Sequence, residues 1–319
     1  MSKYLVTGGA GYIGGVVGRR LLETGHEVVV LDNLSTGFRE GVPDGAEFIE
    51  GDIRDAIKWL DGSYDGVLHF AAYSQVGESV TRPEKYWDNN VGGTMALLAA
   101  MRSAGVRRLV FSSTAAVYGE PARTPVTESD PTAPTSPYGA SKLAVDHMIG
   151  GACTAHGLAA VSLRYFNVAG AYRGSGERHE PESHLVPLLL DVALGRRASV
   201  SVYGSDYPTP DGTCVRDYIH VADLAEAHLL ALDAAREGEQ LICNLGNGSG
   251  YSVAEVIETV RAVTGHPVPV TAAPRRAGDP AVLVASAAKA RELLGWAPRR
   301  PALAGIVADA WEFARTRES

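Results

Sequence analysis

Cysteine is scarce in this sequence, and its three residues, Cys153, Cys214 and Cys243, lie far apart. They form no Cys-x-x-Cys pair, and an odd number argues against a framework of disulfide bonds. We therefore expect a reducing, cytoplasmic setting. The chain also has no apolar run of the ~20 residues that would span a bilayer. It opens directly on a strand-like segment, residues 3–7, so we expect no signal peptide. We expect no membrane partner.

Positive charge is limited as well, since 29 Lys and Arg stand against 37 Asp and Glu and the net charge is -8. No basic run is interleaved with aromatic residues, as is typical of nucleic-acid-binding segments. We expect no nucleic-acid partner. The nine histidines contain no His-Glu-x-x-His motif and no cluster with metal-ligand spacing, so the expectation for a metal is none.

Strands and helices alternate through the first half of the chain. Short apolar runs predict strands at 3–7, 27–31, 47–50, 66–70, 108–112 and 159–164. Helical patterns cover 12–24, 87–104 and 138–156. This alternation predicts an α/β protein with a Rossmann-type doubly wound parallel sheet.

The pattern changes after about residue 167, where loops rich in Gly, Pro and Tyr appear. Later helical patterns cover 221–235, 252–263 and 303–315. We expect residues 1–168 plus about 215–245 to form the dinucleotide-binding domain. The rest, about 169–214 plus 246–319, would form a smaller mixed α/β C-terminal substrate lobe.

A glycine motif joins the first strand to the first helix: Gly8, Gly11 and Gly14 follow the pattern G-x-x-G-x-x-G. Glycines there let a pyrophosphate approach the amide groups of the helix N-terminus. Asp32 ends the second strand, where a carboxylate accepts hydrogen bonds from a ribose and favours NAD over NADP; Arg39 weakens that preference. Other expected cofactor residues lie beside the motif and at the next strand ends: Tyr12, Ile13, Asn33, Ser35, Thr36, Gly37, Asp52, Ile53, Phe70, Ala71 and Ala72. Asp52 is placed to hold the amino group of the adenine but serves equally well as a helix N-cap, and the glycine motif alone fits a glycine-rich turn.

Tyr138 and Lys142 are four residues apart on a helix that Ser136 caps and Pro137 begins. A nearby ammonium favours the phenolate, so the tyrosine becomes a usable base near neutral pH. Thr114, at the end of a strand, is placed to bridge Tyr138 and a substrate oxygen. Alone, such a pair fits an exposed helix with an incidental contact; beside a dinucleotide site it predicts hydride transfer at a carbinol carbon.

The chain resembles the extended short-chain dehydrogenase/reductase superfamily and, within it, the UDP-glucose 4-epimerase family. The resemblance covers nearly the whole sequence. Its motifs are Gly8–Gly14, Asp32–Ser35, His69–Ala72, Val76–Val80, Asn89–Val91, Ser112–Gly119, Tyr138–Lys142, Arg164–Asn167 and Tyr207–Val221. It implies a tightly bound NAD, regenerated each turnover, that oxidises the sugar at C4 to a 4-keto intermediate and returns the hydride on the opposite face.

The resemblance also implies residue roles. Tyr138 would be the base and Thr114 a proton relay, while Lys142 would lower the phenol pKa and bind the nicotinamide ribose. Further nicotinamide-side residues would be Asn90, Ser112, Ser113 and Tyr165. The UDP-sugar would be held by Asn167, His184, Leu185, Ser201, Tyr203, Arg216, Tyr218, Val253, Arg276 and Asp279. The helices at 87–104 and 143–156 carry apolar residues on more than one face, among them Leu97, Met101, Val145 and Ile149. In this superfamily these helices commonly pair across a two-fold axis, which implies a homodimer; ordinary burial within the chain is the alternative.

Other readings stay open at this point. A 4,6-dehydratase or decarboxylase has the same fold, but a dehydratase usually carries an acidic pair where this chain has Ala115 and Ala116. Epimerases of UDP-glucuronate or of N-acetylated UDP-sugars are alternatives with the same chemistry. A bulky Leu283 favours the sugars without an N-acetyl group. A non-catalytic NAD-sensing protein is a remote alternative. The chain departs from other members at His184, where they have Asn, and at Ser74, where some have Lys.

Overall fold

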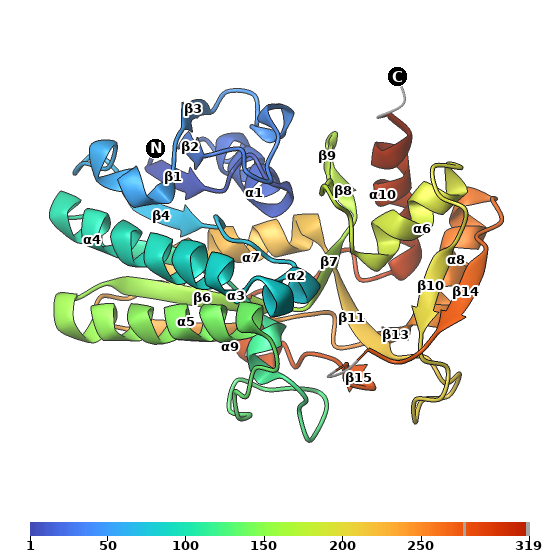
Figure 1. Ribbon diagram of the computed structural model, residues 1–319. Coiled ribbons are helices and arrows are strands. Elements are labelled where there is room, and N and C mark those ends of the chain that lie inside the picture. Colours follow the sequence, from blue (N-terminus) through green and yellow to red (C-terminus); the bar gives the residue numbers. More distant parts are fainter. Residues whose placement is uncertain (277–278, 317–319) are drawn as a thin grey trace.

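A seven-stranded parallel sheet forms the larger part of the molecule (Figure 1), in a computed structural model that describes residues 1–276 and 279–316. The strand order is β12-β6-β5-β4-β1-β2-β3. The strands are β1 Lys3–Thr7, β2 Glu27–Asp32, β3 Glu47–Glu50, β4 Gly66–His69, β5 Arg108–Thr114, β6 Ala159–Tyr165 and β12 Gln240–Leu245. Every pairing between them is parallel. The predicted doubly wound α/β fold is confirmed.

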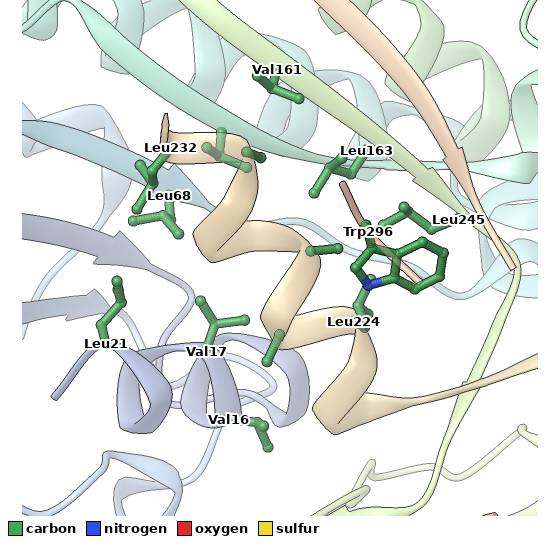
Figure 2. Packing of buried hydrophobic residues seen from close by; sticks show 14 of the residues in the cluster. Val16, Val17, Leu21, Leu68, Val161, Leu163, Leu224, Leu232, Leu245 and Trp296 are labelled. Atoms are coloured by element: carbon green, nitrogen blue, oxygen red, sulfur yellow. The ribbon is translucent and has the colours of Figure 1, made fainter. Parts of the chain in front are cut away.

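Helices cover both faces of this sheet. The apolar sides of α1 (Tyr12–Glu23), α7 (Val221–Ala234) and α9 (Ala288–Leu294) pack on one face. Figure 2 shows Val17 of α1 and Leu224 of α7 within that core, with Leu224 next to Trp296. The other face is covered by α4 (Thr94–Ala104), α5 (Pro137–His156) and the short helix η2 (Ile53–Lys58). Burial on both faces explains why the strands read as continuous apolar runs.

The order of the strands reverses between β1 and β4, and ligands of open α/β sheets bind at such a switch point, beyond the carboxyl ends of the strands. The loops that follow the two strands touch here. Gly8 has a φ of 73°, and a Cβ on it would come within 2.6 Å of the amide nitrogen of Ala71. Only glycine allows this close approach of backbone to backbone.

A smaller lobe follows, built from short sheets and three helices that share an apolar core. Its helices are α6 Leu185–Ala193, α8 Val253–Thr264 and α10 Leu303–Thr316. Its strands are β7 Asn167–Ala169, β8 Ala171–Tyr172, β9 Ser175–Gly176, β10 Val200–Tyr203, β11 Val215–His220, β13 Gly250–Ser252, β14 Val270–Ala273 and β15 Val282–Leu283. In this arrangement α7 and β12 rejoin the large sheet, whereas β11 pairs with strands of the smaller lobe. The exact division of the chain into domains stays a prediction.

The segment predicted as one helix over 87–104 has a different form. Short helices α2 (Val76–Thr81) and α3 (Pro83–Tyr86) precede a π-helical stretch, η3 (Trp87–Gly93), and only then does α4 begin. A Cβ at Gly93 would collide with the side chain of Ile53, so glycine lets η3 lie close against η2. The remaining short helices are η1 Arg39–Gly41 and η4 Ala115–Tyr118.

Candidate active site

The glycine loop has the form that a pyrophosphate site needs. A Cβ on Gly14 would clash with the carbonyl oxygen of Gly8, so the turn between β1 and α1 closes only with glycine. Gly11 caps α1 without a side-chain hydrogen bond, and the first turn holds no acidic residue. The amide groups of Tyr12 and Ile13 therefore present a positive helix end with no competing carboxylate. These residues fit the diphosphate of a dinucleotide.

Asp32 lies at the end of β2, next to this loop, and is 8% exposed. Its two carboxylate oxygens accept hydrogen bonds from the backbone amides of Ala10 (3.0 Å) and Leu34 (2.8 Å). Burial raises the pKa of the carboxyl group, which those two bonds partly oppose. The loop that follows β2 returns to the glycine loop, since a Cβ on Gly37 would lie 3.0 Å from the carbonyl carbon of Ala10. The ribose contact of Asp32 and the cofactor roles of Asn33, Ser35 and Thr36 stay predictions.

Asp52 has the capping role that was the alternative to adenine binding. Its carboxylate accepts hydrogen bonds from the amide of Arg54 (2.9 Å) and from the side chain of Asn33 (3.2 Å), and it caps η2. The guanidinium of Arg54 lies 3.0 Å from the same carboxylate. Ile53 is buried in the core. The Asp52 side chain is therefore already bonded on two sides, and its role toward adenine stays a prediction.

Tyr138, Thr114 and Lys142 lie together at the carboxyl end of β5. The predicted start of the helix is confirmed: α5 begins at Pro137, and the hydroxyl of Ser136 accepts a hydrogen bond from the amide of Gly139 at 3.2 Å. Tyr138 is 9% exposed and hydrogen-bonds to the hydroxyl of Thr114. One turn later, the buried ammonium of Lys142 donates a hydrogen bond to the carbonyl oxygen of Ser112.

Burial is the main influence on the pKa values of Tyr138 and Lys142 in this structure. Burial raises the pKa of Tyr138, although the hydrogen bond with Thr114 opposes the increase. Burial also lowers the pKa of Lys142 to about 7, and the carboxylate of Asp146 opposes the decrease. The ammonium of Lys142 donates its hydrogen bond to the backbone carbonyl oxygen of Ser112. Both groups lose their hydration and the ammonium is directed at a backbone carbonyl, so the role of Lys142 in lowering the phenol pKa stays a prediction.

The nicotinamide-side residues fall into two groups. Side chains alternate along β5, so Ser112 and Thr114 share one face: the hydroxyl of Ser112 contacts that of Tyr165. Ser113 points to the other face and hydrogen-bonds to buried Asp146 at 3.2 Å. Its predicted cofactor contact therefore cannot come from its hydroxyl.

Asn90 is almost fully buried, and its side-chain amide is engaged in hydrogen bonds with the loop that contains Tyr73 and with Ser141. Its side-chain oxygen accepts from the amide of Tyr73 (2.9 Å), while its nitrogen donates to the carbonyl of Tyr73 (3.0 Å) and to Ser141 (3.1 Å). Asn90 thus ties the segment after β4, which includes Phe70, Ala71 and Ala72, to α5. Phe70 packs against the ring of His228, with centroids 4.9 Å apart.

The predicted UDP residues lie in the smaller lobe. Asn167 and Tyr218 are paired on adjacent strands and share a side-chain hydrogen bond. Arg216 forms an ion pair with Asp279, so that carboxylate is not free for a ribose in this structure. The Arg276 guanidinium lies 3.9 Å from the centre of the Tyr203 ring. The other members occupy the ends or edges of nearby elements: His184 and Leu185 at α6, Ser201 on β10 and Val253 at α8.

One group of residues was missed. The sequence analysis expected no cluster of metal-ligand groups, yet the structure brings together Glu177, His179, Glu182 and His184. Burial alone would lower the pKa of His184, but the carboxylates of Glu177 and Glu182 raise it to about 10. The signal was the density of Glu and His within eight residues. It was overlooked because the segment is a loop, whose irregular spacing matches no helical or hairpin ligand pattern.

The sheet, the glycine loop and the Tyr138–Lys142 pair define a dinucleotide-binding protein of the short-chain dehydrogenase type. The chain belongs to the NAD dependent epimerase/dehydratase family, which it matches over residues 4–246.

The chain is similar to characterised relatives over nearly its whole length. It is 72% identical over 316 residues to a UDP-glucose 4-epimerase of Streptomyces lividans, covering 98% of this chain and 95% of that protein. A solved UDP-glucose 4-epimerase from Brucella ovis, in complex with NAD, superposes with a TM-score of 0.94 at 45% identity, covering 98% of both chains. A second solved UDP-glucose 4-epimerase, from Bifidobacterium longum in complex with NAD+ and UDP, superposes with a TM-score of 0.93 at 38% identity. The match covers 99% of both chains. The predicted family, NAD dependence and 4-epimerase activity are confirmed.

Proposed function

We propose that this chain interconverts UDP-glucose and UDP-galactose with a bound NAD. The observation that carries the proposal is the position of the Tyr138 phenol, buried at the carboxyl edge of the parallel sheet beside the Thr114 hydroxyl. The glycine loop that fits a dinucleotide lies at the same edge. NAD, when bound, supplies the hydride acceptor for C4 of the sugar.

The residues of the chain move the proton and hold the substrate. Tyr138 removes the proton of the 4-hydroxyl, directly or through Thr114, and gives it back after the sugar has presented its other face. Lys142 supplies a buried cation beside the site. No acid or base follows Thr114, because Ala115 and Ala116 occupy those positions. Elimination of water from the sugar, which a 4,6-dehydratase performs, therefore has no proton donor there.

Arg216 and Arg276 provide the cations for the diphosphate. Both guanidiniums, together with the Asp279 carboxylate, lie close enough to Cys214 to influence the pKa of its thiol. A UDP-sugar that enters would compete with Asp279 for Arg216, and two arginines can bind a pyrophosphate through paired hydrogen bonds. Leu283 pairs with Arg216 on the adjacent strand and packs against the core beneath the site. This placement supports its predicted role in favouring sugars without an N-acetyl group.

The homodimer and the cytoplasmic location belong to the proposal. Of the apolar residues on which the dimer rested, Leu97, Met101, Val145 and Ile149 are buried inside the chain. The outer face of the same helices nevertheless keeps Trp87 and Met95, which are 43% and 62% exposed. The cysteines of the described chain are free and buried, which suits a reducing compartment. No helix among the described residues is long and apolar enough to cross a bilayer.

A labelled substrate tests the reaction. UDP-galactose that carries deuterium at C4 should give UDP-glucose with the deuterium still at C4, because the hydride leaves and returns within one active site. The control is unlabelled substrate in deuterated water, which should acquire no label at C4. Loss of label to solvent, or absence of UDP-glucose, would overturn the proposal.

A further inference from the structure

The loop between β9 and α6 gathers four side chains, of which only His184 was predicted to contact the substrate. One ligand atom from each, two carboxylate oxygens and two imidazole nitrogens, lies within 4.8 Å of all the others. We propose that this loop binds one divalent transition-metal ion, best fitted by Zn²⁺, through Glu177, His179, Glu182 and His184.

The distances approach those of a tetrahedral site. Ligands about 2.0–2.1 Å from a tetrahedral Zn²⁺ lie about 3.3 Å from one another. Here the Nδ1 atom of His184 lies 2.9 Å from Glu177 and 2.8 Å from Glu182. The Nδ1 atom of His179 lies 3.5 Å from each of the same two carboxylates. Shifts of about half an ångström would bring these pairs to the spacing around the ion.

The charges also call for a divalent cation. The side chains of Glu177 and Glu182 are only 7% and 12% exposed. Two carboxylates with little hydration are costly unless they are paired or bind a metal. A divalent ion bound by two neutral imidazoles would neutralise both carboxylates.

His179 adds independent support. Within the described part of the chain its Nδ1 atom is buried and has no hydrogen-bond partner, although it is directed at the two carboxylates. A buried ring nitrogen without a partner is uncommon in native structures. A metal ion between the four groups would satisfy it.

The site lies where the two parts of the molecule meet. Tyr12, the first residue of α1, donates a hydrogen bond to the carbonyl of Gly170 at 2.6 Å. Gln75 donates to the carbonyl of Pro181 at 2.9 Å, and the Arg178 guanidinium lies 3.4 Å from the centre of the Phe38 ring. Metal binding would therefore fix the segment that joins the glycine-loop side to α6. We assign the ion a structural role.

The test uses the full chain produced without a histidine tag, stripped with a chelator and titrated with ZnCl₂ by calorimetry. The expected stoichiometry is about one ion per chain, with a rise in the thermal unfolding midpoint of about 5 °C at a hundredfold excess over the dissociation constant. His179→Gln and Glu182→Gln should each weaken binding by tenfold or more. The exposed His266, far from the loop in sequence, supplies the control His266→Gln, which should bind as the wild type does.

Cobalt gives a readout that needs no variant. Co²⁺ bound to the wild-type chain should show the intense visible absorption of a tetrahedral site, and Zn²⁺ should displace it. Absence of stoichiometric Zn²⁺ binding, an octahedral Co²⁺ spectrum, or equal affinity in wild type and Glu182→Gln would each overturn the proposal. None of these results depends on epimerase activity, so they are independent of the proposed function.

Discussion

The ammonium group of Lys142 donates a 2.7 Å hydrogen bond to the carbonyl oxygen of Ser112. This bond ties the first turns of α5 to the end of β5, the strand that also carries Thr114. Lys142 is 3% exposed and lies 4.7 Å from the centre of the Phe111 ring. The cation is therefore held at the site by the backbone and not by the phenol that it was expected to activate.

Replacing this lysine should remove both the cation and its position. We expect Lys142→Met to lower kcat by about a hundredfold or more, the scale of a group that assists proton transfer. It should also reduce the NAD that copurifies with the chain, because the predicted ribose contact is lost. Activity and the NAD content per chain are the two measurements. A variant that keeps kcat within a few-fold of the wild type would show that the buried cation is dispensable.

The hydroxyl of Thr114 has two partners, since it accepts a hydrogen bond from the amide of Ala116 and bonds to Tyr138. Thr114→Val removes the hydroxyl while keeping the shape. We expect kcat to fall about tenfold to a hundredfold and the free energy of unfolding to fall by about 1 kcal/mol, the value of an N-cap. Thr114→Ser is the matched control and should retain most of the wild-type kcat and most of the free energy of unfolding. Equal kcat values for the Val and Ser variants would remove the relay from the mechanism.

A pH effect on stability follows from His228. Burial lowers the pKa of this histidine to about 4 in the folded chain. Between the unfolded value of about 6.5 and pH 4, the unfolded chain binds the proton and the folded chain does not, so stability is lost as the pH falls. The loss for this group is about 3 kcal/mol across that window.

His228→Leu should therefore reduce the acid-induced loss of stability by a similar amount. Urea unfolding at pH 7, 6, 5 and 4 provides the comparison. The Leu side chain fills much of the same space, and loses the hydrogen bond with the carbonyl of Leu224 and the ring contacts with Phe70 and Tyr165 at every pH. If wild type and variant lost stability in parallel as the pH fell, another group would be responsible.

The proposed dimer depends on the outer face of α4 and η3. Met95 is 62% exposed there, and a charge at this position would be buried in the interface. We expect Met95→Glu to convert the dimer to a monomer in light scattering at micromolar concentration. Leu293, 45% exposed on α9, supplies the control Leu293→Glu, which should stay dimeric. A monomeric wild type, or a dimeric Met95→Glu variant, would contradict the interface.

Most of the fold was predictable because burial on both faces of a parallel sheet leaves long apolar runs in the sequence. The strands of the first half were predicted within two residues of their observed ends, and α5 begins at Pro137 as its cap indicated. The π-helical turn at Trp87–Gly93 was not predictable from the apolar pattern, and the close packing of Gly93 on Ile53 joins residues that are far apart in the chain.

The site was predicted in its residues but not in its electrostatics. The spacing in the sequence identified Tyr138 and Lys142. The hydrogen bond of the Lys142 ammonium with Ser112 could not be predicted, because it depends on where β5 ends and tertiary packing decides that. The orientation of Ser113 toward Asp146 follows from the alternation of side chains once β5 is known to extend to Thr114. The cluster around His179 lies in a loop, where no periodic pattern indicates which side chains meet.

The central claim is that the Tyr138 oxygen carries the proton during epimerisation, and Tyr138→Phe tests it most directly. The change removes one buried hydroxyl and leaves the packing of the ring against Tyr86 in place. With steady-state kinetics on UDP-galactose we predict a fall in kcat of a hundredfold or more, a KM within a few-fold of wild type and an unchanged NAD content. A variant that epimerises within a few-fold of the wild-type rate would contradict the account.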